Sequence, residues 1–232
     1  MTIQTTLTAQ KLGKYFDHAV LRPDQTTEDV IKGCEVAKKY NLASVCVKPC
    51  DVSQACKLLE DTDVDVGTVI SFPHGNSTTE AKVAESLQAI QDGAVELDVV
   101  INIGFVKSGL YEKVQQELKK IVDLSKEKKQ DVCIKVIFET AYLTNDEIVK
   151  TCELCMASGV DYVKTSTGFG PGGATYEHIE LMRKTVPNTM GVKASGGIKT
   201  LEQVLKYIEL GATRIGSSSS GAIIEEFKAA QK

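Results

Sequence analysis

The chain has no excess of positive charge and no long run of apolar residues. Its 27 Lys and Arg are outnumbered by 31 Asp and Glu, which gives a formal net charge of -4. It therefore lacks the basic field that a nucleic-acid-binding surface needs. No segment approaches the roughly 18 to 20 apolar residues that span a bilayer, and Met1 to Gly13 has no apolar core of signal-peptide type. We expect no nucleic-acid partner, no membrane span and a cytoplasmic protein.

The cysteines form no recognisable disulfide framework or metal site. Their number is odd, and they are scattered through a chain too long to need disulfides. Cys152 and Cys155 form a CxxC motif, but it lacks the second CxxC or nearby histidines that would complete a zinc site. We expect reduced thiols and no bound metal, with redox or metal chemistry at this motif as the minor alternative. The seven cysteines are Cys34, Cys46, Cys50, Cys56, Cys133, Cys152 and Cys155.

What the chain does contain is a regular alternation of short β-branched or apolar runs with longer amphipathic segments. No linker rich in proline, serine or charge interrupts this alternation, and 232 residues suit one barrel-sized domain. We therefore expect a single domain over residues 1–232. The eight expected strands are 15–20, 43–47, 64–71, 95–100, 132–138, 162–165, 191–194 and 212–216.

The segments between these strands begin like helices. Thr144 is followed three residues later by Glu147, which is a capping-box pattern, and threonines also precede acidic residues at 26–29 and 78–80. An open doubly wound sheet uses the same repeating units and remains an alternative. Eight units favour closure, so we predict an α/β protein with a (β/α)8 TIM barrel and a short N-terminal helix at 7–14.

Four charged residues interrupt strands that are otherwise apolar: Asp98, Lys135, Lys164 and Lys193. Chemistry on such barrels gathers at the carboxyl ends of the strands. A buried lysine loses hydration as a cation, so structure alone seldom selects one. One interpretation is an ion network in which Asp98 and Asp17 neutralise the lysines. We favour a catalytic one, because a desolvated lysine near a second ammonium has a lowered pKa and attacks carbonyls as a neutral amine, as Lys164 beside Lys193 would.

Three turns rich in glycine and hydroxyl residues follow the last strands. They are Thr165 to Gly168, Ser195 to Gly197 and Gly216 to Gly221. Small residues let backbone amides approach an anion, and the following helix N-termini add favourable dipoles. Glycine-rich turns also arise merely as connections. The three together predict a phosphate site.

Seven segments of the chain resemble deoxyribose-phosphate aldolases and occur in the family's order. They are FDHAVL, GTVISFPHG, ELDVVINIG, IKVIFE, DYVKTSTGFG, GVKASGGI and ATRIGSSSS, and the resemblance covers the chain from about Phe16 to Gly221. The lysine in KTSTG followed by the lysine in VKASGG is the specific part of the resemblance. These aldolases are class I enzymes on a (β/α)8 barrel, so the resemblance agrees with the expected fold.

The resemblance implies roles for the charged strand residues. Lys164 resembles the family's Schiff-base lysine, Lys193 the neighbouring lysine that lowers its pKa, and Asp98 the carboxylate that transfers protons. Lys135 is similar to a further family lysine that holds Asp98 or positions water. The implied reaction is the reversible cleavage of 2-deoxy-D-ribose 5-phosphate into acetaldehyde and D-glyceraldehyde 3-phosphate, with no cofactor because the protonated imine accepts the electrons.

The resemblance also implies where the substrate lies. We expect Thr167 to contact a substrate hydroxyl, and Asp17 either to hold the lysines or to touch substrate, with a slight preference for the structural role. A homodimer or homotetramer is implied too. The phosphate ligands, chiefly through backbone amides, are expected to be Gly168, Gly196, Gly197, Gly216, Ser217 and Ser218.

The chain departs from the family's pattern at two points. Ala19 stands where the family often has threonine, and the tail ends in FKAAQK without the terminal tyrosine of some members. Two other functions therefore stay open. One is a sugar-phosphate isomerase or synthase that uses acid-base chemistry, and the other is a non-catalytic barrel that binds sugar phosphates.

Overall fold

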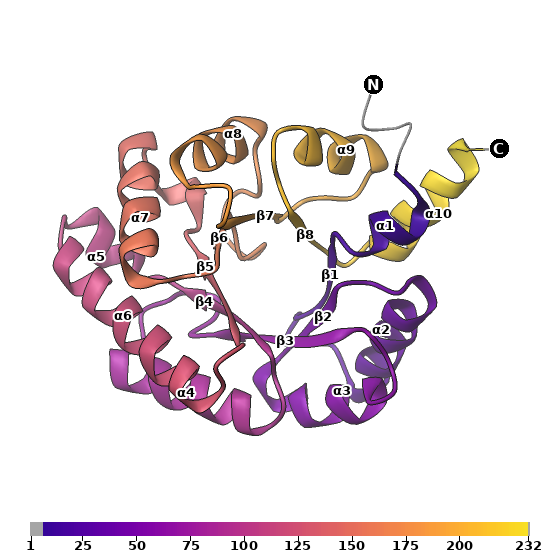
Figure 1. Ribbon diagram of the computed structural model, residues 1–232, viewed down its shortest axis with the longest axis horizontal. Coiled ribbons are helices and arrows are strands. Elements are labelled where there is room, and N and C mark those ends of the chain that lie inside the picture. Colours follow the sequence, from indigo (N-terminus) through magenta and orange to yellow (C-terminus); the bar gives the residue numbers. More distant parts are fainter. Residues whose placement is uncertain (1–6, 232) are drawn as a thin grey trace.

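Eight parallel strands close into a barrel in the computed structural model, which describes residues 7–231. The strands pair in chain order, and β1 pairs with β8 to complete the ring (Figure 1). The predicted (β/α)8 barrel is confirmed, and the open-sheet alternative is wrong. The strands are β1 (Phe16–Val20), β2 (Ser44–Val47), β3 (Asp65–Ile70), β4 (Glu96–Val100), β5 (Cys133–Ile137), β6 (Tyr162–Lys164), β7 (Gly191–Ser195) and β8 (Arg214–Ser217).

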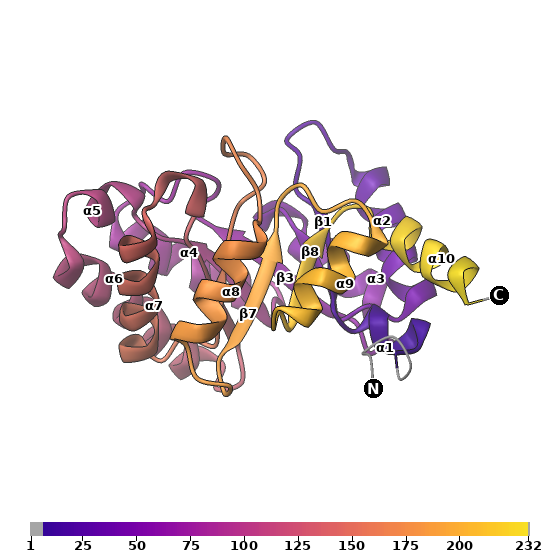
Figure 2. The same ribbon diagram turned by 90° about the horizontal axis from the view of Figure 1, so that it is seen from above.

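Helices surround the ring of strands, and short 3-10 turns follow β2 and β5 (Figures 1 and 2). The capping box at Thr144 and Glu147 forms as predicted, and Thr78 accepts a hydrogen bond from the Ala81 amide at the next expected helix start. The elements are α1 (Ala9–Gly13), α2 (Thr27–Tyr40), η2 (Pro49–Asp51), α3 (Val52–Leu59), α4 (Thr79–Gln91), α5 (Ile103–Lys107), α6 (Tyr111–Lys128), η3 (Thr140–Tyr142), α7 (Asn145–Ser158), α8 (Tyr176–Thr185), α9 (Leu201–Glu209) and α10 (Ser220–Ala230).

The short N-terminal helix is confirmed as α1, which packs against α2 and α10. Thr8 caps it by accepting a hydrogen bond from the Lys11 amide at 3.2 Å. None of the helices within residues 7–231 is both long and apolar enough to span a bilayer.

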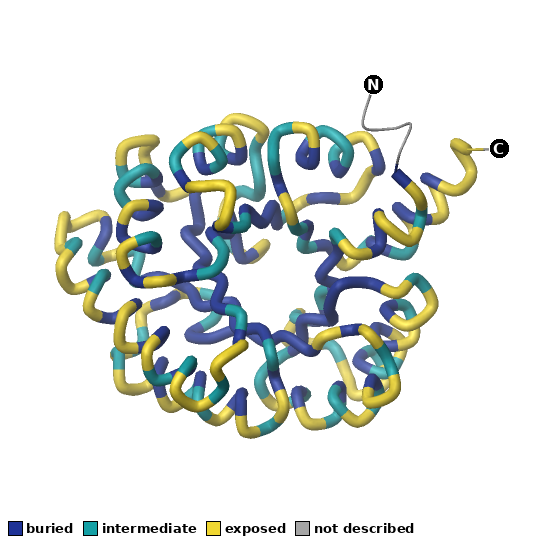
Figure 3. Tube along the Cα trace, viewed as in Figure 1, coloured by how far each residue is buried: buried dark blue, intermediate teal, exposed yellow. Residues whose placement is uncertain are grey.

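The strands are buried on both faces, as Figure 3 shows by their dark ring inside exposed helical surfaces. Successive side chains of a strand point to opposite faces, so the two faces of each strand carry different residues. On β4, Leu97 and Val99 belong to the apolar core, whereas Glu96 and Asp98 point the other way, into the barrel. The alternation therefore places charge inside the barrel and apolar packing outside it.

Candidate active site

A cavity of about 270 Å³ opens at the carboxyl ends of the strands. Lys164 and Lys193 line it, and so does every residue that the sequence analysis assigned to substrate binding: Asp17, Thr167, Gly168, Gly196, Gly197, Gly216, Ser217 and Ser218. Asp98 and Lys135 lie deeper, outside the lining that the described residues form. The predicted residues therefore divide into a cavity wall and a buried layer beneath it.

The strand register brings the charged side chains together. Lys164 on β6 is level with Lys193 on β7, and Asp98 on β4 is level with Lys135 on β5. Residues that face the barrel interior alternate with residues that face the helices, so the three lysines and Asp98 all point inward. The fold thus gathers residues that are up to 95 positions apart in the sequence, as in the hydrogen bond from Lys193 to Asp98.

One carboxylate oxygen links the two lysines of the cavity wall. Asp98 Oδ2 accepts hydrogen bonds from Lys164 Nζ at 2.7 Å and from Lys193 Nζ at 2.6 Å. All three side chains are no more than 4% exposed. The shared oxygen holds the two amines near each other at the floor of the cavity.

The surroundings favour loss of a proton from Lys164 rather than from Lys193. Burial, aided by the positive charge of Lys193, lowers the pKa of Lys164 even though Asp98 opposes the shift. Burial also acts against the charge of Lys193, but Asp17 and Asp98 outweigh it and raise the pKa of Lys193. Lys164 is therefore the amine that is more easily neutral, and Lys193 is the ammonium beside it.

The carboxylates of the buried layer stay ionised. Burial alone would raise the pKa of Asp98, but Lys135, Lys164 and Lys193 together hold it well below its usual range. Asp17 is held low in the same way by Lys135, Lys193 and Arg214. Asp17 both lines the cavity and pairs with Lys193 Nζ at 2.5 Å, so the structural and substrate-contact roles expected for it are compatible.

Lys135 lies among three carboxylates. Its Nζ is 2.5 Å from Glu96 Oε2, 3.2 Å from Asp98 Oδ1 and 3.3 Å from Asp17 Oδ2. Burial disfavours the charge of Lys135, but Asp17, Asp98 and Glu96 raise its pKa well above the usual value. Lys135 is therefore a fixed cation that holds Asp98 from below.

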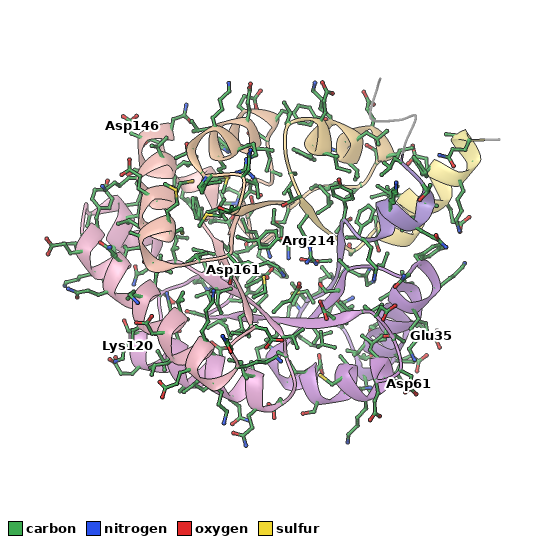
Figure 4. All side chains as sticks on the ribbon, viewed as in Figure 1. Glu35, Asp61, Lys120, Asp146, Asp161 and Arg214 are labelled. Atoms are coloured by element: carbon green, nitrogen blue, oxygen red, sulfur yellow. The ribbon has the colours of Figure 1, made fainter. Side chains whose placement is uncertain are left out.

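The sequence analysis missed two members of this charged layer, Glu96 and Arg214. Arg214 Nη1 is 2.5 Å from Asp17 Oδ1, and its Nη2 is 3.0 Å from Glu96 Oε1. Figure 4 shows Arg214 within the ring of strands, whereas Glu35 and Lys120 lie on the outer helices α2 and α6. The same signal that marked Asp98, a charge inside an apolar strand, is present for both residues in ELDVV and ATRIG.

The predicted glycine turns lie next to one another around the mouth of the cavity. Gly196 and Gly197 have φ angles of 89° and 76°, which favour glycine because a Cβ atom is strained there. A Cβ atom on Gly196 would lie 3.6 Å from the Cα atom of Gly168, so the turns after β6 and β7 pack against each other through their backbones. Ser217 Oγ donates to the carbonyl oxygen of Ile198 at 2.7 Å and joins the turns after β7 and β8.

Thr167 lies in the cavity wall, but its hydroxyl proton is already donated within the protein. The hydroxyl donates to Glu139 Oε2 and accepts from the Phe169 amide at 3.0 Å. Glu139, also missed in the sequence, is 2% exposed and has a φ of 54°. These bonds leave the Thr167 oxygen as an acceptor, so a substrate hydroxyl would have to donate to it.

Other residues border the cavity without having been predicted. Arg22, Gln25 and Lys199 lie at its edge, and Ala19 is part of the wall where a threonine would add a hydroxyl. Cys46 also borders it, and burial raises the pKa of its thiol to about 12. Lys199 follows the glycine turn after β7, whereas the exposed Arg22 guanidinium pairs with Asp24 Oδ2 at 2.5 Å.

The CxxC motif lies away from this site. Cys152 and Cys155 are buried free thiols within α7, and burial raises the pKa of Cys152 to about 12. Within residues 7–231, no group of three or more His, Cys, Asp or Glu side chains is arranged to hold a metal ion.

Comparison with known proteins identifies the family of this chain. A family model described as DeoC/LacD family aldolase matches residues 11–224. A deoxyribose-phosphate aldolase of Caldanaerobacter subterraneus subsp. tengcongensis is 49% identical over 217 residues, which cover 94% of each chain. A deoxyribose-phosphate aldolase of Clostridium botulinum is 53% identical over 215 residues, covering 93% of this chain and 100% of that protein.

A solved structure gives the same result. The tetrameric deoxyribose phosphate aldolase of Aeropyrum pernix superposes with a TM-score of 0.89 at 30% sequence identity, over 96% of this chain and 93% of that one. The barrel, the cavity with its buried lysines and these similarities agree with one another. The chain belongs to the DeoC/LacD family of aldolases and is accordingly a lyase.

Proposed function

We propose that the protein reversibly cleaves 2-deoxy-D-ribose 5-phosphate to acetaldehyde and D-glyceraldehyde 3-phosphate through an imine on Lys164. The observation that carries this proposal is a buried amine that borders a cavity, lies 2.7 Å from Asp98 Oδ2 and has a lowered pKa because of burial. A neutral amine is the form that adds to a carbonyl. The names of the relatives supply the substrate.

Cleavage begins when the neutral Lys164 amine adds to the aldehyde carbon of the open-chain sugar. Loss of water gives a protonated imine, which draws electrons from the C2–C3 bond as the C3 hydroxyl gives up its proton. That bond breaks, and glyceraldehyde 3-phosphate leaves behind an enamine of acetaldehyde. Protonation of the enamine carbon and hydrolysis of the imine release acetaldehyde and restore Lys164. Synthesis runs these steps backwards.

Asp98 is proposed to move protons in these steps. Its Oδ2 contacts Lys164 Nζ directly, so it is placed to take a proton from the nitrogen during addition and to return one during hydrolysis. Because Asp98 lies beneath the cavity wall, its exchange with the carbon and the C3 hydroxyl would pass through a water in the cavity. Lys193 and Lys135 would hold this carboxylate ionised and in place.

The glycine turns are proposed to hold the phosphate. Backbone amides at Gly168, Gly196, Gly197 and Gly216 to Ser218 border one side of the cavity, and α10 starts at Ser220 close behind them. Amides at a helix start attract an anion through their partial positive charge. With the phosphate there, the aldehyde carbon can extend toward Lys164 on the cavity floor.

Three broader expectations accompany this proposal. We propose that residues 1–232 act as one catalytic domain. A homo-oligomer is proposed by analogy with the tetrameric relative from Aeropyrum pernix. Phosphorylated sugars of this kind are cytoplasmic metabolites, so the proposed reaction implies a cytoplasmic location.

Reductive trapping tests the nucleophile. The protein is treated with acetaldehyde and borohydride, which reduces an imine to a stable amine, and intact mass and peptide mapping locate the adduct. We expect one ethyl group on Lys164, and none at this position in the Lys164→Met variant, together with loss of deoxyribose 5-phosphate cleavage. An active, folded protein without a selective adduct would instead favour an isomerase or synthase that uses acid-base chemistry.

A further inference from the structure

Six charged side chains inside the barrel form a closed ring in which positive and negative groups alternate. From Asp98 the ring passes to Lys193 at 2.6 Å, from there to Asp17 at 2.5 Å, and then to Arg214 at 2.5 Å. It continues from Arg214 to Glu96 at 3.0 Å, to Lys135 at 2.5 Å, and back to Asp98 at 3.2 Å. Lys135 and Asp17 also pair across the ring at 3.3 Å.

The ring carries no net charge, because its three cations match its three carboxylates. Lys164 is a seventh ionisable group, and the one carboxylate that it contacts within residues 7–231 is Asp98, through Oδ2. An ammonium at Lys164 would therefore add an unbalanced positive charge to a region almost closed to water. A buried charge without a matching partner is costly, so the balance favours the neutral amine.

The other titratable groups around Lys164 and the ring do not supply that missing charge. Cys46 borders Lys164, but burial raises the pKa of its thiol to about 12 and keeps it neutral. Cys133, at the start of β5 near Lys135, is kept neutral because burial raises the pKa of its thiol in the same way. The Tyr162 ring lies 5.7 Å from the Arg214 guanidinium. Asp65 begins β3 at the exposed amino end of the barrel, where it faces Glu96, Arg214 and Lys135 of the ring, and it does not line the cavity that Lys164 borders.

We propose that Glu96 and Arg214 are positioning residues that set the protonation of Lys164, by closing a ring whose charges balance only when Lys164 is neutral. Neither side chain borders the cavity in the part of the chain that the structure describes, so neither touches substrate. Arg214 holds Asp17 Oδ1 and leaves Oδ2 to Lys193. Glu96 holds Lys135, which in turn supports Asp98. This inference rests on the proposed imine chemistry at Lys164.

Removing one charge of either sign tests the proposal, because the two changes should act in opposite directions. Arg214→Gln leaves the ring with an excess negative charge, which stabilises an ammonium at Lys164. The acid limb of kcat/KM for deoxyribose 5-phosphate cleavage should move to higher pH by roughly one unit. Glu96→Gln leaves an excess positive charge and should move the limb to lower pH by a similar amount. Below the wild-type midpoint, Arg214→Gln should be about tenfold slower in reductive trapping by acetaldehyde.

Matched variants separate charge from structure. Arg214→Lys keeps the charge and should restore the wild-type midpoint. The double variant Glu96→Gln/Arg214→Gln removes one charge of each sign, so its limb should return close to that of the wild type. Two controls lie outside the ring: Glu117→Gln, at the buried α4–α6 contact, and Arg183→Gln, whose half-buried guanidinium donates to the Val186 and Met190 carbonyls. Neither control should move the limb.

The possible outcomes distinguish the charge-ring proposal from the proposed imine chemistry at Lys164. Opposite shifts in the single variants, cancelled in the double variant, would support the charge ring. If trapping on Lys164 occurs but its pH midpoint is unchanged, or moves in one direction in both variants, the ring proposal is overturned and the imine proposal stands. If a single variant does not fold, the direction in the other one and the midpoint of the double variant still decide. Absence of any adduct on wild-type Lys164 would overturn the proposed function itself.

Discussion

Two buried lysines of this protein lie in different regions, one inside the barrel and one between the barrel and its helices. Lys164 is 2.7 Å from Asp98 Oδ2, and Lys82 of α4 is 2.5 Å from Glu117 Oε1 of α6. Burial lowers the pKa of both lysines. A lowered pKa therefore does not by itself mark a nucleophile.

The two lysines differ in their hydrogen-bond partners and in whether they border the cavity. Lys82 also donates to the carbonyl oxygen of Val100 at 2.9 Å, and Glu117 Oε2 accepts from Thr79 Oγ at 3.1 Å, so this pair is satisfied locally. Lys164 instead shares Asp98 with Lys193 and Lys135, and it borders a cavity. A shared carboxylate and an open side distinguish a lysine suited to chemistry from one that joins two helices.

The largest expected effect comes from removing the amine inside the barrel. Lys164→Met should lower kcat for deoxyribose 5-phosphate cleavage by roughly ten-thousand-fold or more, because no other group can form the imine at the same point. Steady-state kinetics with purified protein measure this loss. Circular dichroism should show a folded protein, since the new side chain is of similar length and apolar.

Lys82→Met is the matched control for that experiment. It removes an equally buried amine with a lowered pKa, yet folded protein should keep kcat within about twofold because Lys82 touches neither the cavity nor the ring. A comparable loss of kcat in both variants would mean that general destabilisation, and not chemistry at Lys164, explains the first result.

The second effect concerns stability in the layer between the barrel and the helices. Glu117→Ala leaves the Lys82 ammonium buried without its carboxylate, which should lower the free energy of unfolding by about 3 to 5 kcal/mol. The double variant Lys82→Met/Glu117→Leu should recover most of that loss, because it replaces both charges with apolar groups. Urea unfolding gives both values. A double variant as unstable as Glu117→Ala would show that shape, and not charge, dominates this contact.

A third effect, on the pH dependence of stability, comes from the contact between β1 and α10, in the layer between the barrel and its helices. His18 is 8% exposed, its Nδ1 lies 2.8 Å from Ser220 Oγ, and burial lowers its pKa from 6.5 to about 4. As pH falls below 6.5, His18 binds a proton in the unfolded chain but not in the folded protein. The contribution of His18 to the free energy of unfolding should therefore fall by about 3 kcal/mol toward pH 4 and then level off.

Unfolding free energies at a series of pH values measure this slope. His18→Gln should remove most of the slope between pH 6.5 and 4, because a glutamine amide does not titrate there, and His178, whose pKa burial also lowers, accounts for the rest. His74, which is exposed, serves as the control, and His74→Gln should leave the slope in place. An unchanged slope in His18→Gln would assign the acid sensitivity to the buried carboxylates of the barrel instead.

The fold and the cavity wall were readable from the sequence because both depend on local patterns. Alternating apolar runs, repeated eight times, favoured a closed barrel over an open sheet, and each of the glycine turns begins where a strand ends. Charges within apolar strands marked Asp98, Lys135, Lys164 and Lys193. Their contacts, however, depend on the shear of the barrel, which no single strand reveals.

Depth within the barrel is what the sequence could not give. Glu96 and Arg214 are 118 positions apart and meet across the interior, so only the closed ring of strands makes them neighbours. The same limit explains why neither the depth of Asp98 under the cavity wall nor the Glu139 contact with Thr167 was predicted. Contacts between side chains of distant strands form only when the barrel closes, so the order of residues along the chain does not reveal them.

The smallest expected effect compares two glycines whose local geometry is alike. Gly197 and Gly109 have φ angles of 76° and 67°, and a Cβ atom on either would meet no heavy atom of the described residues within 4 Å. Gly197→Ala and Gly109→Ala should therefore each cost about 1 kcal/mol of stability through backbone strain. Only at Gly197 is the open space that of the cavity, so only Gly197→Ala should raise KM for deoxyribose 5-phosphate, by about tenfold, without the same effect on unphosphorylated deoxyribose. Equal KM values in the two variants would place the phosphate away from this turn.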